Sequence, residues 1–343
     1  MKESKIKKKN TFLKKLFLKL SRRLGYEVMD QSDLTLQDLD GSNSKSSLSK
    51  LGVNSLTLPM GTVKITRPVK SLDIILRTCA SVKMLTQSKE RVFEKEKSEY
   101  TLRCLKSIVN SIKFSEDELK KIKIKLTIID FNSDQTIIDK FEAILNNNFF
   151  SYDIKKLEYE KYSTQISGTN KENKPVTNNQ KSNMSNIHQS IELSKTCDDL
   201  IYFVEDDYIH SVETIKEMIL TYEKLSSLLN KELILCPADY PYLYNEINKS
   251  NIFLGEKRHW RSIKETLCTF LTSKDIVIKY WDSLTSMCKL EHYPFEKPLH
   301  NIYEKELCLS PIPSLAIHCT NINSIYGLSP NIDWKQVWDE NST

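Results

Sequence analysis

The sequence predicts an α/β fold with a mostly parallel central sheet, and two observations predict it. Short apolar runs rich in β-branched residues alternate with longer amphipathic stretches, which is the order of parallel strands joined by helices. Several of these runs end abruptly in polar or acidic residues, as expected of strands whose carboxyl ends meet at one edge of a sheet. A third observation, the clustering of basic residues early in the chain, predicts an amphipathic helix ahead of this fold.

Composition sets the first limits on function. The chain has 343 residues, of which 39% are hydrophobic and 28% charged, which suits a soluble globular protein with a sizeable core. No apolar run reaches the roughly 18 residues that cross a membrane. The eight cysteines include no C-x-x-C pair, which argues against a zinc ribbon or a thioredoxin-like motif. Free thiols in a reducing cytoplasm are therefore expected.

The first 25 residues carry the positive charge. Ten of them are lysine or arginine and one is acidic, a charge of +9, which leaves −4 for the rest of a chain whose net charge is +5. From Thr11 to Leu24 apolar residues recur at helical spacing with basic residues between them, and Gly25 suits a helix end. Such a helix can lie on an anionic membrane surface. Docking on the body of the protein and binding of nucleic acid are the alternatives, and the position of both aromatic residues on the apolar face disfavours nucleic acid.

The rest of the chain divides by composition and periodicity. We expect a membrane-surface segment over residues 1–25, a linker with short strands over 26–70, the α/β domain over 71–330 and a tail over 331–343. The apolar runs predict strands over 73–79, 122–129, 157–162, 200–204, 232–237, 262–272 and 315–318. The amphipathic stretches predict helices over 99–112, 137–145, 183–194, 212–229 and 274–284, the last capped by Ser273. The polar residues 163–182 predict a long mobile loop.

Three consecutive carboxylates, Glu205, Asp206 and Asp207, follow the apolar run 200–204. Acids at the end of a buried strand repel one another and are costly to desolvate. A divalent cation would offset that cost, and carboxylate oxygens suit Mg²⁺ or Mn²⁺. A polar turn with solvated acids is the alternative, but the abrupt change from apolar to acidic residues favours a metal site.

The glycines narrow the choice of ligand. There are only seven, and none form G-x-G-x-x-G or G-x-x-x-x-G-K-[ST], so a dinucleotide site of the Rossmann type and a P-loop are both disfavoured. A phosphorylated ligand would then be held through a metal ion and side chains. A nucleoside diphosphate bridged by a cation at Asp207 fits this description.

The order of these motifs resembles the GT-A fold of nucleotide-sugar glycosyltransferases, closest in style to the large inverting bacterial family, over about residues 71–320. The motifs are a strand ending in a polar residue, Asp130-x-x-Ser133-Asp134, a helix with Asn183 and Asn186, Glu205-Asp206-Asp207 and Pro313-x-x-x-x-His318. Two features depart from the usual pattern. Glu205 stands where aspartate is commoner, and the glycine-rich turns around the second strand are missing.

The resemblance implies roles for particular residues. Asp130 would bind the nucleobase, with Thr78 lining the same pocket, and Asp206 or Glu205 would meet the ribose and phosphate side. Asp207 would bind the metal. The metal set implied in this way also includes Glu205 and His318, since a downstream histidine joins the metal in that family.

The C-terminal third is expected to supply the acceptor side. Glu296 lies between Pro294 and Pro298, which fix the local backbone, and an acid at about this place is the catalytic base in the resembling family. A solvated surface charge is the alternative for Glu296. Asp239, directly after a predicted strand, is the second candidate for the base. Trp260 could stack on an acceptor sugar, although a place in the core is equally consistent with a single tryptophan.

Together these features predict a metal-dependent glycosyltransferase. It would move a sugar from a nucleotide-sugar donor to a hydroxyl group of a glycan or lipid-linked acceptor, with inversion at the anomeric carbon. A cytoplasmic enzyme peripherally bound to the inner face of the membrane would suit envelope polysaccharide biosynthesis. Two alternatives are a metal-dependent nucleotidyltransferase, which would use the same acids on triphosphates, and a non-catalytic module that docks on membranes through its N-terminal segment.

Overall fold

The computed structural model describes residues 12–26, 28, 55–58, 61–81, 92–244, 249–292, 294–319, 329 and 332–343. The chain divides into two compact units, residues 1–46 with 57–62 and residues 47–56 with 63–343. Residues 29–54 of the predicted linker lie outside the described residues.

In the first unit, the predicted amphipathic helix is confirmed as α1 (Phe12–Arg23). The predicted stop, Gly25, follows the helix end by two residues, and its φ of 84° is the left-handed conformation that favours glycine. The apolar side chains of α1 are largely exposed, with Phe12 at 80% and Phe17 at 57%. Within the described parts of the chain, no helix combines the length and apolar character needed to cross a membrane. Two short strands, β1 (Ser55–Leu58) and β2 (Gly61–Lys64), contain residues of both units and form a separate two-stranded sheet.

The second unit is built on a nine-stranded sheet of order β5-β4-β3-β6-β11-β8-β12-β10-β9. The first four are β3 (Ser71–Thr78), β4 (Lys123–Asp130), β5 (Ser151–Lys156) and β6 (Leu200–Glu205). The others are β8 (Ile234–Leu235), β9 (Ile252–Leu254), β10 (His259–Ile263), β11 (Phe270–Ser273) and β12 (Cys308–Ile312). In this sheet, the pairings make β10 and β11 antiparallel to the other strands, which are all parallel to one another. The predicted α/β fold with a mostly parallel sheet is confirmed.

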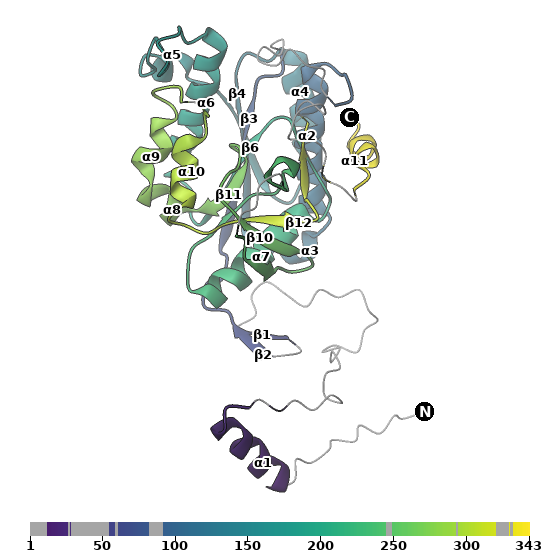
Figure 1. Cartoon of the computed structure of the whole chain (residues 1–343). Helices are drawn as coiled ribbons and strands as arrows, with labels where there is room; N and C mark the ends of the chain where they lie inside the picture. Colours follow the sequence, from purple (N-terminus) through teal and green to yellow (C-terminus); the bar gives the residue numbers. More distant parts are fainter. Residues whose placement is uncertain are drawn as a thin grey trace. The chain divides into compact units, whose positions relative to one another are not determined.

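Helices cover both faces of this sheet (Figure 1). One face packs against α2 (Lys97–Lys113), α4 (Gln135–Leu145), α7 (Thr214–Leu229) and α11 (Trp334–Glu340), with the short α3 (Glu116–Leu119) beside them. The other packs against α6 (Asn178–Ser194), α8 (Lys274–Lys279), α9 (Trp281–Ser286) and α10 (Lys297–Tyr303), with α5 (Tyr159–Ser163) against α6. Side chains alternate between these two cores, as in β6, where Tyr202 faces the first and Phe203 the second.

The order of the strands marks where a ligand would bind. The chain runs outward from β3 through β4 to β5 and then returns to the other side of β3 as β6. The direction of strand order therefore reverses between β3 and β6. In open α/β sheets, ligands bind outside the carboxyl ends of the strands at such a switch point. Here those ends carry Arg77 and Glu205, which are paired in register.

A small second sheet continues from the acidic turn. β7 (Tyr208–His210) follows Asp207 directly and pairs antiparallel with β13 (Ala316–His318). In this register His318 lies opposite Tyr208. The C-terminal histidine is thereby delivered to the end of β6, although more than 100 residues separate them in sequence.

Several predicted boundaries are wrong. Residues 157–162 are not a strand: the strand is β5, just before them, and α5 places Tyr162 against α6, where it contacts His188. The predicted strand 262–272 is two strands, because the charged Lys264-Glu265 pair interrupts its apolar pattern. The predicted helix 274–284 breaks at Tyr280 into α8 and α9, although Ser273 does cap α8 by accepting from the Ile276 N–H at 3.3 Å.

Candidate active site

The switch point between β3 and β6 holds a buried arginine side chain, Arg77, between two polar side chains. Arg77 is 6% exposed, and its Nη2 lies 3.2 Å from Glu205 Oε1 in an ion pair. Its Nη1 donates to Asn183 Oδ1 at 3.0 Å. Because the guanidinium only donates, the amide oxygen of Asn183 must face it and the amide N–H groups must point away. Glu205 is therefore held by Arg77 at the sheet edge, which offsets the cost of placing its charge there.

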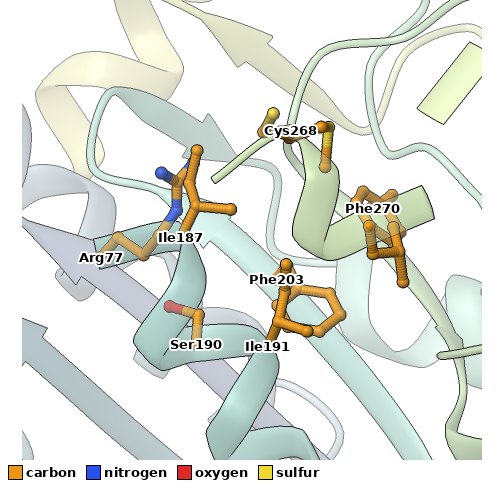
Figure 2. A pocket seen from close by; sticks show the side chains of 9 residues that line it. Arg77, Ile187, Ser190, Ile191, Phe203, Cys268 and Phe270 are labelled. Carbon is orange, nitrogen blue, oxygen red and sulfur yellow. The ribbon is translucent and has the colours of Figure 1, made fainter. Parts of the chain in front are cut away.

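Arg77 also lines a small apolar pocket on the α6 face of the sheet. Figure 2 shows its guanidinium beside Ile187, with Phe203 and Phe270 further along the pocket. Arg77 falls within the predicted strand 73–79, and the sequence motifs gave it no role. The strand that contains Arg77 was already predicted to be parallel. An arginine on that strand, in register with the first acid of the triplet, could have indicated the ion pair.

Asp206 points to the opposite side of the sheet edge, since successive side chains of an extended chain alternate. Its Oδ2 accepts from the Cys79 N–H at 3.1 Å and the Thr101 hydroxyl at 2.9 Å, and Lys97 Nζ lies 2.9 Å from its Oδ1. Asp206 is 7% exposed. Three donors inside the fold hold this carboxylate, so it joins β3, β6 and α2, and its contact with ribose or phosphate stays a prediction.

Asp207 and His318 face one another at the end of β6. Asp207 Oδ2 lies 3.3 Å from His318 Nε2, and both side chains are largely shielded from solvent. The imidazole stacks on the Tyr208 ring with 4.6 Å between centroids and 10° between planes. The backbone holds the pair as well, because the Cys319 N–H donates to the Asp207 carbonyl at 2.8 Å.

These two side chains fit a divalent cation that is completed by a substrate. Mg²⁺ and related ions are commonly bound by one or two carboxylates together with substrate phosphates, and neutral imidazole is a common metal ligand in proteins. In the described ranges no three histidine, cysteine or acidic side chains converge on one point. Glu205, a predicted metal ligand, is turned toward Arg77. The arrangement thus offers Asp207 and His318, with the remaining positions left for phosphate oxygens and water.

Asp130 and Thr78 lie together at the ends of β4 and β3. Asp130 Oδ1 accepts from the Thr78 hydroxyl at 2.7 Å and the Ser133 hydroxyl at 2.6 Å, and its Oδ2 accepts from the Ser133 N–H at 2.9 Å. Asn132 completes this turn with a φ of 56°. The predicted base-pocket pair is therefore in one place. Its carboxylate is already engaged in shaping the turn.

Glu296 lies close enough to the end of β6 for the charge of Glu205 to affect its pKa. It precedes α10, and its carbonyl accepts from the N–H groups of Leu299 and His300 at 2.8 and 3.0 Å. Burial, followed by the nearby negative charge of Glu205, raises the pKa of Glu296 to about 7, while the charges of His318 and Arg77 act in the opposite direction. A carboxylate with a pKa near neutrality is suited to accept a proton at physiological pH.

The side chains of the other predicted acceptor-side residues are engaged inside the fold, although Asp239 lines a small pocket together with His318. Asp239 is 5% exposed and is held by Arg261, whose Nη2 and Nε lie 2.8 and 3.1 Å from its Oδ1, and by the Tyr244 hydroxyl at 2.6 Å from Oδ2. Its charge is neutralised inside the fold. Trp260 is fully buried in β10 and donates to Glu217 Oε1 at 3.2 Å, so its predicted stacking on an acceptor sugar is wrong.

Comparison with known proteins gives structural similarities only. No family model and no curated protein matches the chain. Among solved structures, the galactosyltransferase LgtC in complex with donor and acceptor sugar analogues is 8% identical, with a TM-score of 0.31 over 62% of this chain and 64% of that one. Mouse xyloside xylosyltransferase 1 is 8% identical, with a TM-score of 0.36 over 68% and 76%. A UDP-glucose pyrophosphorylase complexed with UDP-glucose is 8% identical, with a TM-score of 0.39 over 78% and 99%.

The matched region thus spans just under two thirds of the galactosyltransferase chain. The proteins found include glycosyltransferases, the class that the sequence motifs resemble. At these identities and TM-scores the similarities assign no activity.

Proposed function

We propose that the protein is a metal-dependent glycosyltransferase that uses a nucleotide-sugar donor. The observation that carries the proposal is the Asp207–His318 pair at the end of β6, 3.3 Å apart and next to the switch point between β3 and β6. A carboxylate and an imidazole at this position suit a cation that also binds a diphosphate. A bound Mn²⁺ or Mg²⁺ would offset the negative charge that develops on the leaving nucleoside diphosphate.

The residues of the chain have distinct tasks in this proposal. Thr78 and the Asp130 turn form the side of the site toward the nucleobase. Glu296 takes the proton of an acceptor hydroxyl. The hydroxyl oxygen then bonds to the anomeric carbon, and the bond from that carbon to the diphosphate breaks with its electron pair on the diphosphate oxygen. One displacement of this kind inverts the anomeric carbon.

The acceptor is proposed to be a glycan or a lipid-linked glycan at a membrane surface. Support comes from α1, whose exposed apolar residues alternate with lysine and arginine, since such a face complements anionic lipid. An enzyme held at the cytoplasmic face of the membrane would reach acceptors used in envelope polysaccharide biosynthesis. Nucleic acid is not proposed as a partner.

A donor panel tests the central proposal. Nucleoside diphosphate-sugars are screened by thermal shift with and without Mn²⁺, and nucleoside triphosphates are screened in parallel. We expect at least one diphosphate-sugar to raise the melting temperature in a Mn²⁺-dependent manner and to be turned over. Turnover of a triphosphate with release of pyrophosphate, and no turnover of any diphosphate-sugar, would instead establish the nucleotidyltransferase alternative.

A further inference from the structure

Residues 164–177, expected to be a mobile loop, form an ordered turn, here named the 164–177 turn. Its two arms pair where Thr169 bridges Pro175 and where the Val176 N–H donates to the Gly168 carbonyl at 3.0 Å. At its tip, Asn170 Oδ1 accepts from the backbone N–H groups of Glu172 and Lys174, both at 2.9 Å. The last five residues of the predicted loop belong to α6, which begins at Asn178.

Apolar side chains fix this turn to the segment that carries Glu296. Ile166 and Val176 from the turn and Met184 from α6 form a small buried cluster of their own, separate from the two main cores. Phe295 packs against this cluster and also against the core on the α6 face of the sheet. A single aromatic ring therefore joins the turn, α6 and the main core.

Polar contacts repeat the same connection. The Ser167 N–H donates to the Lys289 carbonyl at 2.8 Å. Gln180, which completes the capping box of α6 with Thr177, also donates through its side chain to Glu291. The 164–177 turn and the first turn of α6 thus each make one hydrogen bond to the polypeptide ahead of Glu296. These two bonds add to the contacts of the Phe295 ring.

Glu296 is consequently held from both directions along the chain. On its C-terminal side the first turn of α10 fixes its backbone, and on its N-terminal side Phe295 occupies the cluster. We propose that Phe295, seated in the cluster formed by Ile166, Val176 and Met184, is the positioning residue that places the Glu296 carboxylate at the acceptor side of the site. This inference rests on the proposed function and names a residue and a turn that neither the motifs nor the strand order identified.

Phe295→Ala tests the proposal, with Phe149→Ala as the matched control. Both phenylalanines are partly buried, and Phe149 packs on the other face of the sheet, in the main core beside α4 and β5. With the active nucleotide-sugar found in the donor panel, Phe295→Ala should lower kcat on the order of 10²-fold, as small misplacements of a catalytic group do. The dissociation constant for the nucleotide with Mn²⁺ should stay unchanged, and Phe295→Leu, which refills the cluster, should recover most of the rate.

A second measurement does not depend on activity. Val176→Ala, a milder change within the turn, should increase amide hydrogen exchange over residues 294–303 while exchange in β3 and β4 stays as in the wild type. Equal kcat losses in Phe295→Ala and Phe149→Ala, or unchanged exchange over 294–303 in Val176→Ala, would overturn the positioning role. Absence of turnover in the wild-type protein would refute the proposed function instead, and the exchange experiment would still decide whether the turn holds this segment.

Discussion

At the scale of single residues, the acidic triplet separates into three different tasks. Glu205 pairs with the buried Arg77, Asp206 joins β3, β6 and α2, and Asp207 faces His318. The sequence identified the triplet as the centre of the site but could not divide it, because the division depends on which way each side chain leaves the strand end. His318 was implied by the resemblance, as the histidine of Pro313-x-x-x-x-His318, and the pairing of β13 with β7 explains why it reaches Asp207.

The first residue-scale prediction separates metal binding from folding within this triplet. Asp207→Asn should abolish Mn²⁺-dependent nucleotide binding measured by calorimetry, with little change in melting temperature. Asp206→Asn is the matched control, because it alters a buried carboxylate with three donors, and it should lower the melting temperature. His318→Ala should raise the Mn²⁺ concentration needed for half-maximal activity. Unchanged nucleotide affinity in Asp207→Asn would remove the metal from this position.

The second prediction concerns the base. Glu296→Gln should lower kcat by roughly 10²–10⁴-fold, which is typical of lost acid–base catalysis. Nucleotide-sugar binding should change little, because the interaction is lost in the transition state only. Asp239→Asn should instead destabilise the fold, since it leaves Arg261 buried without its partner. Near-full turnover in Glu296→Gln together with a stable but inactive Asp239→Asn would transfer the role to Asp239.

The pH dependence follows from the same residue. Because the pKa of Glu296 is raised to about 7, its carboxylate is mostly protonated below that pH and mostly ionised above it. A base acts in its ionised form, so kcat should rise with pH through an apparent pKa near 7 and then level off. A pH–rate profile on a soluble acceptor measures this. In the residual activity of Glu296→Gln the inflection should be missing, and an inflection that persists in this variant would assign the titration to another group.

At the scale of elements, α1 combines an apolar side exposed to solvent with several basic residues. α1 exposes Leu13 and Leu20 on the same helix that ends in Arg22 and Arg23. We predict that the protein binds liposomes containing anionic lipid and binds neutral liposomes more weakly. Added salt should weaken binding, because exposed charges are screened within about 8 Å at physiological ionic strength. The measurement is flotation of the full chain.

Paired variants distinguish the apolar and the charged contributions of α1. Phe17→Ser should reduce binding at every salt concentration, whereas replacement of Arg22 and Arg23 by glutamine should remove mainly the salt-sensitive part. Flotation that ignores lipid charge, or its absence with all liposomes, would contradict the membrane assignment. Phe149→Ser, a change of the same kind outside α1, should leave flotation unchanged.

At the scale of the whole molecule, the sequence predicted the architecture well because it depends on repeated local patterns. The runs at β3, β4 and β6 were recognisable as strands, since each alternates between two apolar cores. The proximity of Thr78 and Asp130 was predictable because parallel strands end at one edge. The site elements that were missed or misplaced depend on tertiary packing. Arg77 and Phe295 act through contacts with distant segments, and Trp260 is buried by neighbours that periodicity does not reveal.

The division of the chain into two units leads to a prediction at this scale. Removal of residues 1–25 should leave the melting temperature of the remaining protein and its turnover with a soluble acceptor unchanged, because the candidate site lies entirely within the second unit. Turnover with an acceptor embedded in liposomes should fall. Thermal unfolding and parallel assays with the two acceptors measure this, and loss of soluble-acceptor turnover would show that the first unit takes part in the reaction.

The distribution of cysteines provides a native reporter of ligand occupancy. Seven of the eight cysteines are buried, and Cys79 alone is partly exposed. The backbone N–H of Cys79 donates to Asp206. Burial raises the pKa of the Cys79 thiol to about 12, so little thiolate is present at neutral pH and alkylation should be slow. A mild thiol reagent should nevertheless modify the folded protein at this one position. Cys79 lies between the Asp130 turn and the acidic triplet, so a bound nucleotide should protect its thiol from the reagent. Peptide mass mapping of the modified cysteine would then follow donor binding without an engineered label.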